Sequence, residues 1–259
     1  MTASQIDDKR LVVRLARDGR DLRAAQRLRY RVFIEELGGS GSLVDHQARL
    51  EIDAFDAVFD HLLLIDPTRS ADDLADVVGV YRLLRSDKLA PAARFYSEDE
   101  FDLTLLRATG RRLMELGRSC VDPDFRGGTA MLLLWNAVAE YVLKNDVEIM
   151  FGPASFHGTD LDALAQPLSY LHHNHLAPLG LRVSARAASR AAMDTLTPAL
   201  VDKRAAVAAI PALIKAYLRL GGYVGDGAWV DHTFNTTDVC VVMDTHAMSA
   251  RHRAFYTRA

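Results

Sequence analysis

The chain has 259 residues, a formal net charge of −3, 49% hydrophobic residues and 25% charged residues, the composition of an ordinary globular protein with a sizeable core. This balance gives no overall basic field for binding nucleic acid, and no apolar run reaches the ~18–20 residues of a membrane-spanning helix. The first ten residues, MTASQIDDKR, lack the apolar segment of a secretory signal. We therefore expect a cytoplasmic protein that binds no nucleic acid.

The first half of the chain predicts a helix followed by a meander of strands. Asp18 can cap the helix at its start, and Gly38-Gly39 can end it. The expected elements are, in order, a strand over 11–15, a helix over 21–37, a long loop over 38–56, and two antiparallel strands over 59–66 and 77–84.

The second half alternates strands with helices. Gly152-Pro153 is expected to end a short strand, and Gly221-Gly222 a late helix. The expected elements are a central strand over 114–121, a helix over 128–144, a strand over 148–151, helices over 161–173 and 208–220, and a last strand over 239–243. This order favours a mixed sheet with helices on both faces.

Several segments together resemble one known family. They are LRYRVFIEELG from residue 28, EIDAFDAVFDHLLLID from residue 51, ELGRSCVDPDFR from residue 115, and IKAYLRLGGYVGDGAWVDHTFNTTDV from residue 214. In this order they are similar to the bacterial ornithine–acyl-carrier-protein N-acyltransferases, which begin ornithine-lipid synthesis. The resemblance covers most of the chain, from about residue 11 to residue 243.

The first half is also similar to the acyl-homoserine-lactone synthases. The residues that match their pattern are Arg29, Phe33, Asp53, Asp56, Arg82, Glu115 and Arg118. Two departures favour the ornithine family: Gly38-Gly39 stand where an aromatic residue is expected, and NTTDV is not a feature of the synthases.

Both resemblances imply the GNAT fold. The expected fold class is therefore α/β (mixed α+β), with a central twisted mixed sheet flanked by helices and an extra helical C-terminal elaboration. We expect a single domain over 1–259, with a core over about 11–160 and the elaboration over about 161–259 packed on it.

The implied reaction is aminolysis of a thioester, which needs an amine that has lost its proton and donors for the oxyanion. Glu115 and Arg118 are the predicted catalytic pair. Positions three apart lie on opposite faces of a strand, so both serve one site only if the strand bends, which Gly117 allows. Such a bulge would free N–H groups near Ser119 and Cys120 for the oxyanion. The alternative is a solvated Glu and a surface Arg flanking a core strand.

The acceptor is expected to bind at the acidic run of Asp53, Asp56 and Asp60, because ornithine carries a distal ammonium group. The alternative is a charged loop beside two core aromatic residues. Arg82 either binds the amino-acid carboxylate or supports this loop. Arg29, one helical turn from the expected substrate residue Phe33, is expected to pair with the aspartates and hold the loop closed.

The donor is expected to be acyl carrier protein. A glycine-rich turn precedes the helix after the central strand, but the glycine of the coenzyme A motif falls on Thr129. This degenerate motif favours the single phosphate of a phosphopantetheine arm, which Arg126 would bind unless it is an ordinary turn arginine. Ser155 lies in a segment of small residues that the arm could approach, and Phe156 could line the acyl tunnel. We expect no permanently bound cofactor.

Other chemistries have weaker support. Cys120 and Cys240 lie in apolar runs and are expected to be buried free thiols. Neither Cys120 nor Ser155 sits in a nucleophile motif. The cluster His172, His173 and His175 lacks the spacing of a zinc site.

The expected function is transfer of a (3-hydroxy)fatty acyl group from acyl carrier protein to the α-amino group of ornithine. Alternatives are another N-acylamino-acid synthase using glycine or lysine, an acyl-homoserine-lactone synthase, and a module that binds acyl carrier protein without turnover. The amphipathic helix over 208–220 carries Lys215 and Arg219, and it suggests peripheral contact with the inner membrane.

Overall fold

The computed structural model describes residues 11–90 and 93–246, so the first ten residues, in which no secretory signal is expected, lie outside the described residues. The chain forms two compact units, and each unit is built from two separate stretches of sequence. Unit 1 comprises the chain up to Leu84 together with Leu116–Asn145. Unit 2 comprises Arg85–Glu115 and the chain from Asp146 onward. The single-domain organisation expected from the sequence stays a prediction.

Unit 1 is built around strands in the order β1-β2-β3-β5. Their bounds are β1 Val12–Leu15, β2 Asp60–Ile65, β3 Val77–Arg85 and β5 Leu113–Val121. β2 pairs antiparallel with both β1 and β3, which confirms the predicted antiparallel pair. Every residue of β3 except the last is buried, as expected for a strand covered on both faces.

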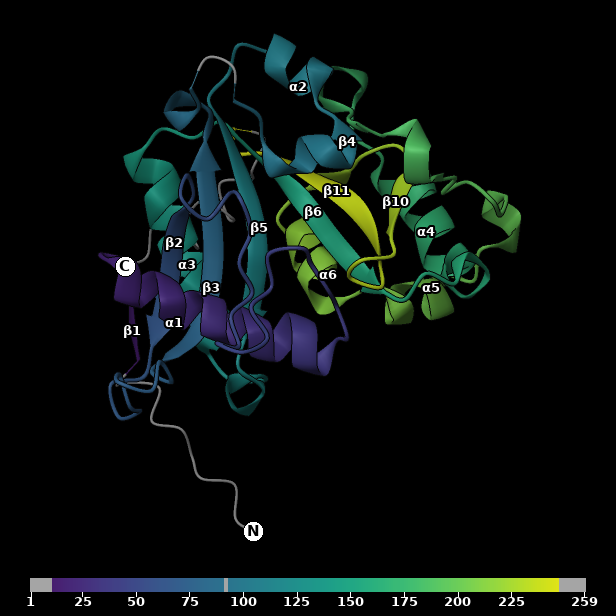
Figure 1. Cartoon of the computed structure of the whole chain (residues 1–259). Helices are drawn as coiled ribbons and strands as arrows, with labels where there is room; N and C mark the ends of the chain where they lie inside the picture. The colour runs from purple at the N-terminus through teal and green to yellow at the C-terminus, as the bar shows by residue number, and fades with distance from the viewer. Residues whose placement is uncertain (1–10, 91–92, 247–259) are drawn as a thin grey trace. The chain divides into compact units, whose positions relative to one another are not determined.

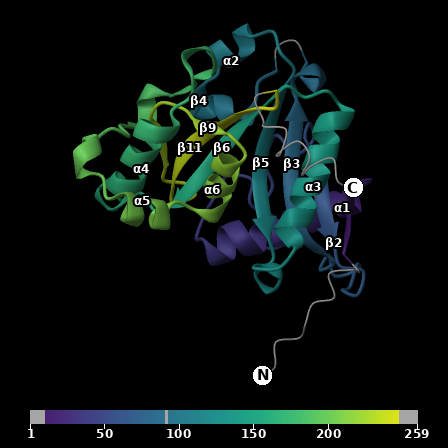
Figure 2. The ribbon, with the colours of Figure 1, turned by 180° about the vertical axis from the view of Figure 1, so that it is seen from behind.

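Helices cover the two faces of this sheet. They are α1 Gly19–Arg29, continued by a π-helix at Tyr30–Glu36, a 3₁₀ turn at Pro123–Phe125, and α3 Ala130–Lys144. α1 crosses in front of β2 and β3 in Figure 1, and α3 lies on the opposite face, in front in Figure 2. Asp18 caps α1 as predicted, because its side chain accepts a hydrogen bond from the Asp21 N–H.

The first helix differs from the prediction of one α-helix over 21–37. Its last part is π-helical, and the Leu37 N–H reaches five residues back to the Val32 carbonyl. Val32 is buried and Phe33 packs against the same core, so two successive residues face inward at this wider turn. This core also contains the Cys120 side chain.

Unit 2 contains a second group of strands. Residues Leu113–Glu115 of β5 pair parallel with the start of β6, which runs antiparallel to β11. The strands are β6 Ile149–His157, β8 Arg190–Ala191, β9 Tyr223–Val224, β10 Ala228–Asp231 and β11 Thr236–Asp244, with β4 Phe101–Asp102 and β7 Ser184–Ala185 forming a separate pair. Parallel and antiparallel pairing together make this a mixed sheet.

The prediction that Gly152-Pro153 ends the strand is wrong, because β6 continues to His157. Pro153 lies opposite Cys240 of β11. The Cys240 carbonyl accepts from the Gly225 N–H, on the side of β11 away from β6. Pro153 and Cys240 are therefore a non-hydrogen-bonded pair, and the proline costs this ladder no hydrogen bond.

Short helices complete unit 2: α2 Thr104–Ala108, α4 Leu161–His175, α5 Lys203–Ala209, α6 Ala212–Arg219, and 3₁₀ turns at Ser86–Lys88, Tyr96–Asp99, Leu179–Leu181, Ala187–Ser189 and Pro198–Leu200. The predicted helix over 208–220 is wrong at its start. Pro211 lacks an N–H and disfavours helical backbone at Ile210, so the chain forms α5 and α6 instead. Within 11–90 and 93–246, every helix is too short or too polar to cross a lipid bilayer.

Candidate active site

A cluster of buried ion pairs lies in unit 1, where α1 meets the loop before β2. Arg29 is fully buried, and its Nε lies 2.5 Å from the Glu51 carboxylate. Its two terminal nitrogens donate to the Asp56 carboxylate at 2.6 and 2.9 Å. Gln26 also donates to Asp56, at 2.8 Å. Arg29 therefore pairs with the acidic loop as the sequence predicts.

Two more arginines complete this cluster. Arg82 of β3 is fully buried, and its Nη1 lies 2.5 Å from Asp53 and 3.1 Å from Asp56. Arg118 of β5 lies 3.2 Å from Glu51 and 3.4 Å from Asp53. Three guanidinium groups are thus balanced by three carboxylates. We call Arg29, Arg82, Arg118, Glu51, Asp53 and Asp56 the ion cluster.

The charges of the ion cluster stabilise one another. Burial alone would raise the pKa of Asp56, but the hydrogen bonds and charge of Arg29 outweigh it and hold that pKa well below its usual range. The charges of Arg82 and Arg118 likewise overcome burial and lower the pKa of Asp53. Asp53 and Asp56 make this loop acidic in sequence, but both carboxylates form ion pairs with arginines of the same cluster.

Accessibility separates the members of the ion cluster. The side chains of Asp53 and Arg118 are 16% and 13% exposed, whereas those of Arg29 and Arg82 are 0% exposed. A small molecule that approaches the cluster meets Asp53 and Arg118 first. The inner pairs instead fix the loop, because breaking them would leave charges in the core.

β5 has one irregular backbone position, beside the glycine at which the sequence predicts a bulge. Arg118 has a φ of +49°, a left-handed conformation that costs a non-glycine residue on the order of 1 kcal/mol or more. The neighbouring Gly117 does not take the positive φ itself. A Cβ added at Gly117 would lie in ordinary van der Waals contact with Arg82, 4.0 Å from one of its nitrogens. The Arg118 side chain makes two ion pairs, with Glu51 and Asp53.

Glu115 is 1% exposed and contacts a turn of unit 2. One carboxylate oxygen accepts from the Tyr96 N–H at 2.9 Å. The other accepts from the Ser97 N–H at 2.5 Å and from the Ser97 hydroxyl. Both oxygens therefore accept N–H bonds from the 3₁₀ turn at Tyr96–Asp99, a partner that no sequence pattern indicates.

The residues after Arg118 have different environments. Ser119 is half-buried, whereas the Cys120 side chain is 6% exposed and packs under α1. Burial raises the pKa of the Cys120 thiol to about 12, so the group is a thiol rather than a nucleophilic thiolate at neutral pH. Both cysteines are free and buried.

Asp60 and Arg126, the remaining predicted site residues of unit 1, contact other residues. Asp60 accepts a 2.5 Å hydrogen bond from the Tyr141 hydroxyl. Arg126 is exposed, and it pairs with both oxygens of Glu36 at 2.5 and 2.7 Å. Its Nε also donates to the Val121 carbonyl.

In unit 2, Ser155 and Phe156 point to opposite faces of β6. Ser155 is exposed and pairs in register with Asp238, whereas Phe156 is 2% exposed in the core. The three histidines of α4 include His173, which contacts the Leu196 carbonyl at 2.7 Å. Three carboxylates of unit 2, those of Glu100, Asp231 and Asp238, lie within 4.8 Å of one another.

The sequence analysis did not single out Glu51, a member of the ion cluster, or Gln26 and His61, which both contact Asp56. Glu51 begins the same acidic run as Asp53 and Asp56, and that spacing was the available signal. His61 is 5% exposed, and one ring nitrogen lies 2.9 Å from the Asp56 carbonyl. Burial lowers its pKa, which keeps the ring neutral beside Arg29 and Arg82.

Comparison with known proteins identifies the class. The family described as Acetyltransferase (GNAT) domain matches residues 28–136. The structure of FeeM, an N-acyl amino acid synthase from uncultured soil microbes, aligns with a TM-score of 0.53 at 13% identity, over 92% of this chain and 94% of FeeM. The acyl-homoserine-lactone synthase LasI aligns with a TM-score of 0.50 at 15% identity, over 90% of this chain and 89% of LasI. The fold is that of the GNAT acyltransferases, as the sequence predicts.

The family within that class follows from sequence identity. An L-ornithine N(α)-acyltransferase of Rhodobacter capsulatus is 63% identical over 246 residues, which are 95% of this chain and 94% of that protein. The chain belongs to the L-ornithine N(α)-acyltransferase family. This confirms the family that the sequence segments predict.

Proposed function

We propose that this chain transfers a (3-hydroxy)fatty acyl group from acyl carrier protein to the α-amino group of L-ornithine and so forms lyso-ornithine lipid. The observation that carries the proposal is the 63% identity, over nearly the whole chain, to a relative that bears the ornithine acyltransferase name. The phosphopantetheine arm of the carrier protein is the proposed donor, and Arg126 its proposed phosphate ligand. Ser155 and Phe156 are the proposed neighbours of the arm and the acyl chain.

The acceptor is proposed to bind at the exposed side of the ion cluster. Asp53 offers a carboxylate to the distal ammonium of ornithine, and Arg118 a guanidinium to its carboxylate. Arg29 and Arg82 hold these two residues in place through Glu51 and Asp56. Phe33, which packs against the core that contains Val32, remains a proposed substrate residue.

Chemistry is proposed to occur along β5. The positive φ of Arg118 supports an interruption of the ladder here, and backbone N–H groups near Ser119 and Cys120 are the proposed donors to the oxyanion. Glu115 is the proposed acceptor of the amine proton, directly or through one water. The amine then attacks the thioester carbonyl, and collapse of the intermediate releases the carrier thiol, which takes up a proton.

The substrates are tested by a thiol-release assay with purified protein. We expect release from acyl carrier protein donors with ornithine, and little with lysine, glycine or S-adenosylmethionine. Mass spectrometry should find the acyl group on the α-nitrogen. Equal rates with glycine or lysine, or no release with any acceptor, would reject ornithine N-acylation.

The role of Glu115 is tested by Glu115→Gln beside Ser97→Ala. Glutamine places an NH₂ group opposite one of the two backbone N–H donors, so Glu115→Gln should also destabilise the protein, by about 1–3 kcal/mol. Ser97→Ala removes one hydrogen bond and keeps the carboxylate. We expect kcat to fall about 10²–10⁴-fold in Glu115→Gln only. Comparable kcat values for the two folded variants would make Glu115 purely structural.

Peripheral contact with the inner membrane is proposed because the product is an amphiphile. α6 supports this contact, since Ile214 and Tyr217 are its buried residues and the helix also carries Lys215 and Arg219. Flotation with anionic vesicles should be reduced in a Lys215/Arg219 double-alanine variant. Unchanged flotation would remove α6 from the contact.

A further inference from the structure

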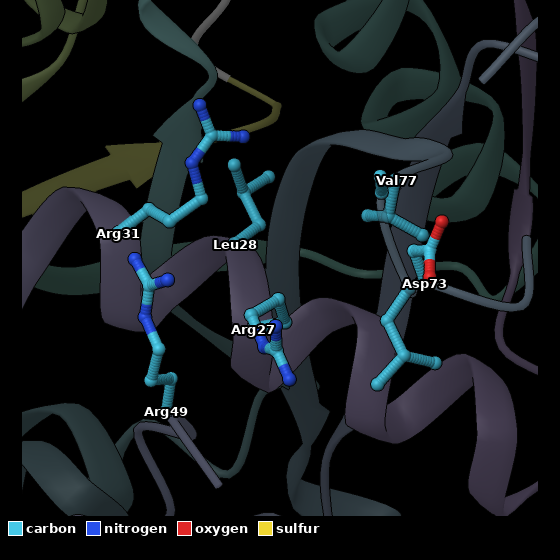
Figure 3. Close-up of a pocket in the computed structure, with 8 residues that line it drawn as sticks. Arg27, Leu28, Arg31, Arg49, Asp73 and Val77 are labelled. Atoms are coloured by element: carbon cyan, nitrogen blue, oxygen red, sulfur yellow. The ribbon is translucent and has the colours of Figure 1, made fainter. Parts of the chain in front are cut away.

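A pocket of about 160 Å³ opens on unit 1, and the described residues that line it do not belong to the ion cluster. α1 and its π-helical continuation form one wall with Arg27, Leu28 and Arg31. The loop before β2 adds Arg49, and the segment leading into β3 adds Asp73, Leu74, Ala75 and Val77. Figure 3 shows Arg27 and Arg31 leaving the helix, Arg49 entering from the loop, and Asp73 on the other side of the pocket.

The three arginines are incompletely neutralised. Arg27 donates from Nη2 to the Ala48 carbonyl at 3.0 Å, a neutral partner. Its Nε is buried and makes no hydrogen bond with the described part of the chain. Arg31 pairs with Asp122 at 2.7 Å, but Asp122 also holds Arg69 at 2.9 Å.

The third arginine has an ion pair that solvent weakens. Arg49 lies 2.5 Å from Glu35, and both side chains are largely exposed, at 51% and 40%. Such pairs contribute little, about 0–1 kcal/mol, and exchange readily with other partners. Among the described residues that line the pocket, Asp73 is the only one with a carboxylate. This carboxylate stands across the pocket from Arg31 and Arg49 (Figure 3).

The arrangement itself opposes stability. Arg27 of α1, Arg31 of the π-helix and Arg49 place three positive charges around one pocket that Asp73 alone, among its described lining residues, can offset. Arg49 and Leu74 have φ values of +53° and +57°, so two of the pocket's residues adopt left-handed backbone. That conformation is unfavourable for a side chain as bulky as leucine. An excess of positive charge and left-handed backbone conformations in one small pocket are typical of a binding site.

We propose that this pocket binds a phosphate group, in a phosphorylated small molecule or a phospholipid headgroup. The three arginines come from two segments, and guanidinium groups bind phosphate oxygens with strong, charge-assisted hydrogen bonds. A phosphate oxygen supplies an acceptor for the buried Arg27 Nε. Leu28 and Val77 supply an apolar wall for the carbon skeleton beside the phosphate.

Calorimetry with inorganic phosphate at low ionic strength tests the site. We expect saturable binding, weakened about tenfold or more in Arg27→Gln and in Arg49→Gln, since each substitution removes a charge-assisted hydrogen-bond donor. Arg23→Gln is the matched control, because Arg23 is exposed on α1 but does not line the pocket. Because the Arg49 side chain is half exposed, Arg49→Gln should leave the fold intact, so a loss of binding in this variant reports the lost guanidinium group.

Vesicles distinguish the two sources of phosphate. Binding to phosphatidylglycerol vesicles that phosphate competes away, and that Arg27→Gln abolishes, would identify a lipid headgroup. Phosphate binding without vesicle binding would identify a soluble ligand. The proposal is overturned if neither probe binds, or if Arg27→Gln and Arg49→Gln leave binding unchanged. It is also overturned if Arg23→Gln weakens binding as much as they do.

Discussion

Replacing Arg29 with methionine should be among the most destabilising single changes in unit 1. Methionine keeps an unbranched apolar stem in the space of the arginine but removes the guanidinium. The Glu51 and Asp56 carboxylates, which are 1% and 6% exposed, then lose partners at 2.5 and 2.6 Å. Breaking one partner out of a buried ion pair costs about 3–5 kcal/mol, because the remaining charge cannot reach water.

The destabilisation should depend on pH in a definite direction. Arg29 holds the pKa of Asp56 below its ordinary value, so this stabilisation is present above that value and is lost as the pH falls through the folded-state pKa. In Arg29→Met, the lowering effect of Arg29 on the Asp56 pKa is lost while the raising effect of burial remains, so this pKa rises. Asp56 of the folded variant therefore takes up a proton at a higher pH. The difference in unfolding free energy should therefore be largest near neutral pH and shrink on acidification.

Urea denaturation at neutral and mildly acidic pH measures both quantities. Arg23→Met is the control, because Arg23 is exposed on the same helix, and it should change stability by less than about 0.5 kcal/mol. A loss below about 1 kcal/mol in Arg29→Met would mean that the ion cluster gains nothing over an apolar core. A loss that stays constant as the pH falls would show that the Asp56 carboxylate is not the group left unpaired.

Two further predictions concern packing. Gly79→Ala should destabilise the protein by about 1–3 kcal/mol, because the new Cβ would lie 3.0 Å from both Leu64 and Leu134. Gly180→Ala has open space and should be nearly neutral in the same denaturation assay, and equal effects would refute the packing argument. Cys120, with its pKa raised to about 12 by burial, should resist a thiol reagent at pH 8 until denaturant is added. Rapid labelling of Cys120 in the folded protein would contradict its placement in the core.

Some features of the fold were readable from local sequence because local physics decides them. Asp18 caps α1, and the apolar runs around Leu63 and Val80 form paired strands, since capping and burial depend on nearby residues. One error was local, because Pro211 itself divides the predicted helix over 208–220. The other arose where a distant partner decides. Pro153 continues β6 because of the register with Cys240, and no residue near Pro153 indicates that register.

The candidate site shows the same division. The sequence brought together Arg29, Asp53, Asp56 and Arg82 by resemblance, and the structure joins them in one cluster. The sequence predicts the pairing of Arg29 with the aspartates, which the structure contains. It leaves open whether Arg82 binds substrate or supports the loop, because the pairing of Arg82 with Asp53, 29 residues away, depends on tertiary structure. The Ser97 partner of Glu115 was missed for the same reason.

The interleaving of the two units limits how this protein can be divided. Each unit needs two stretches of chain, and β5 carries residues of both. A fragment ending near residue 84 would lack the β5 strand of unit 1, and one starting near residue 146 would lack the Glu115 segment of unit 2. Limited proteolysis should therefore yield no independently stable fragment, and truncation at either point should inactivate the whole enzyme rather than separate two activities.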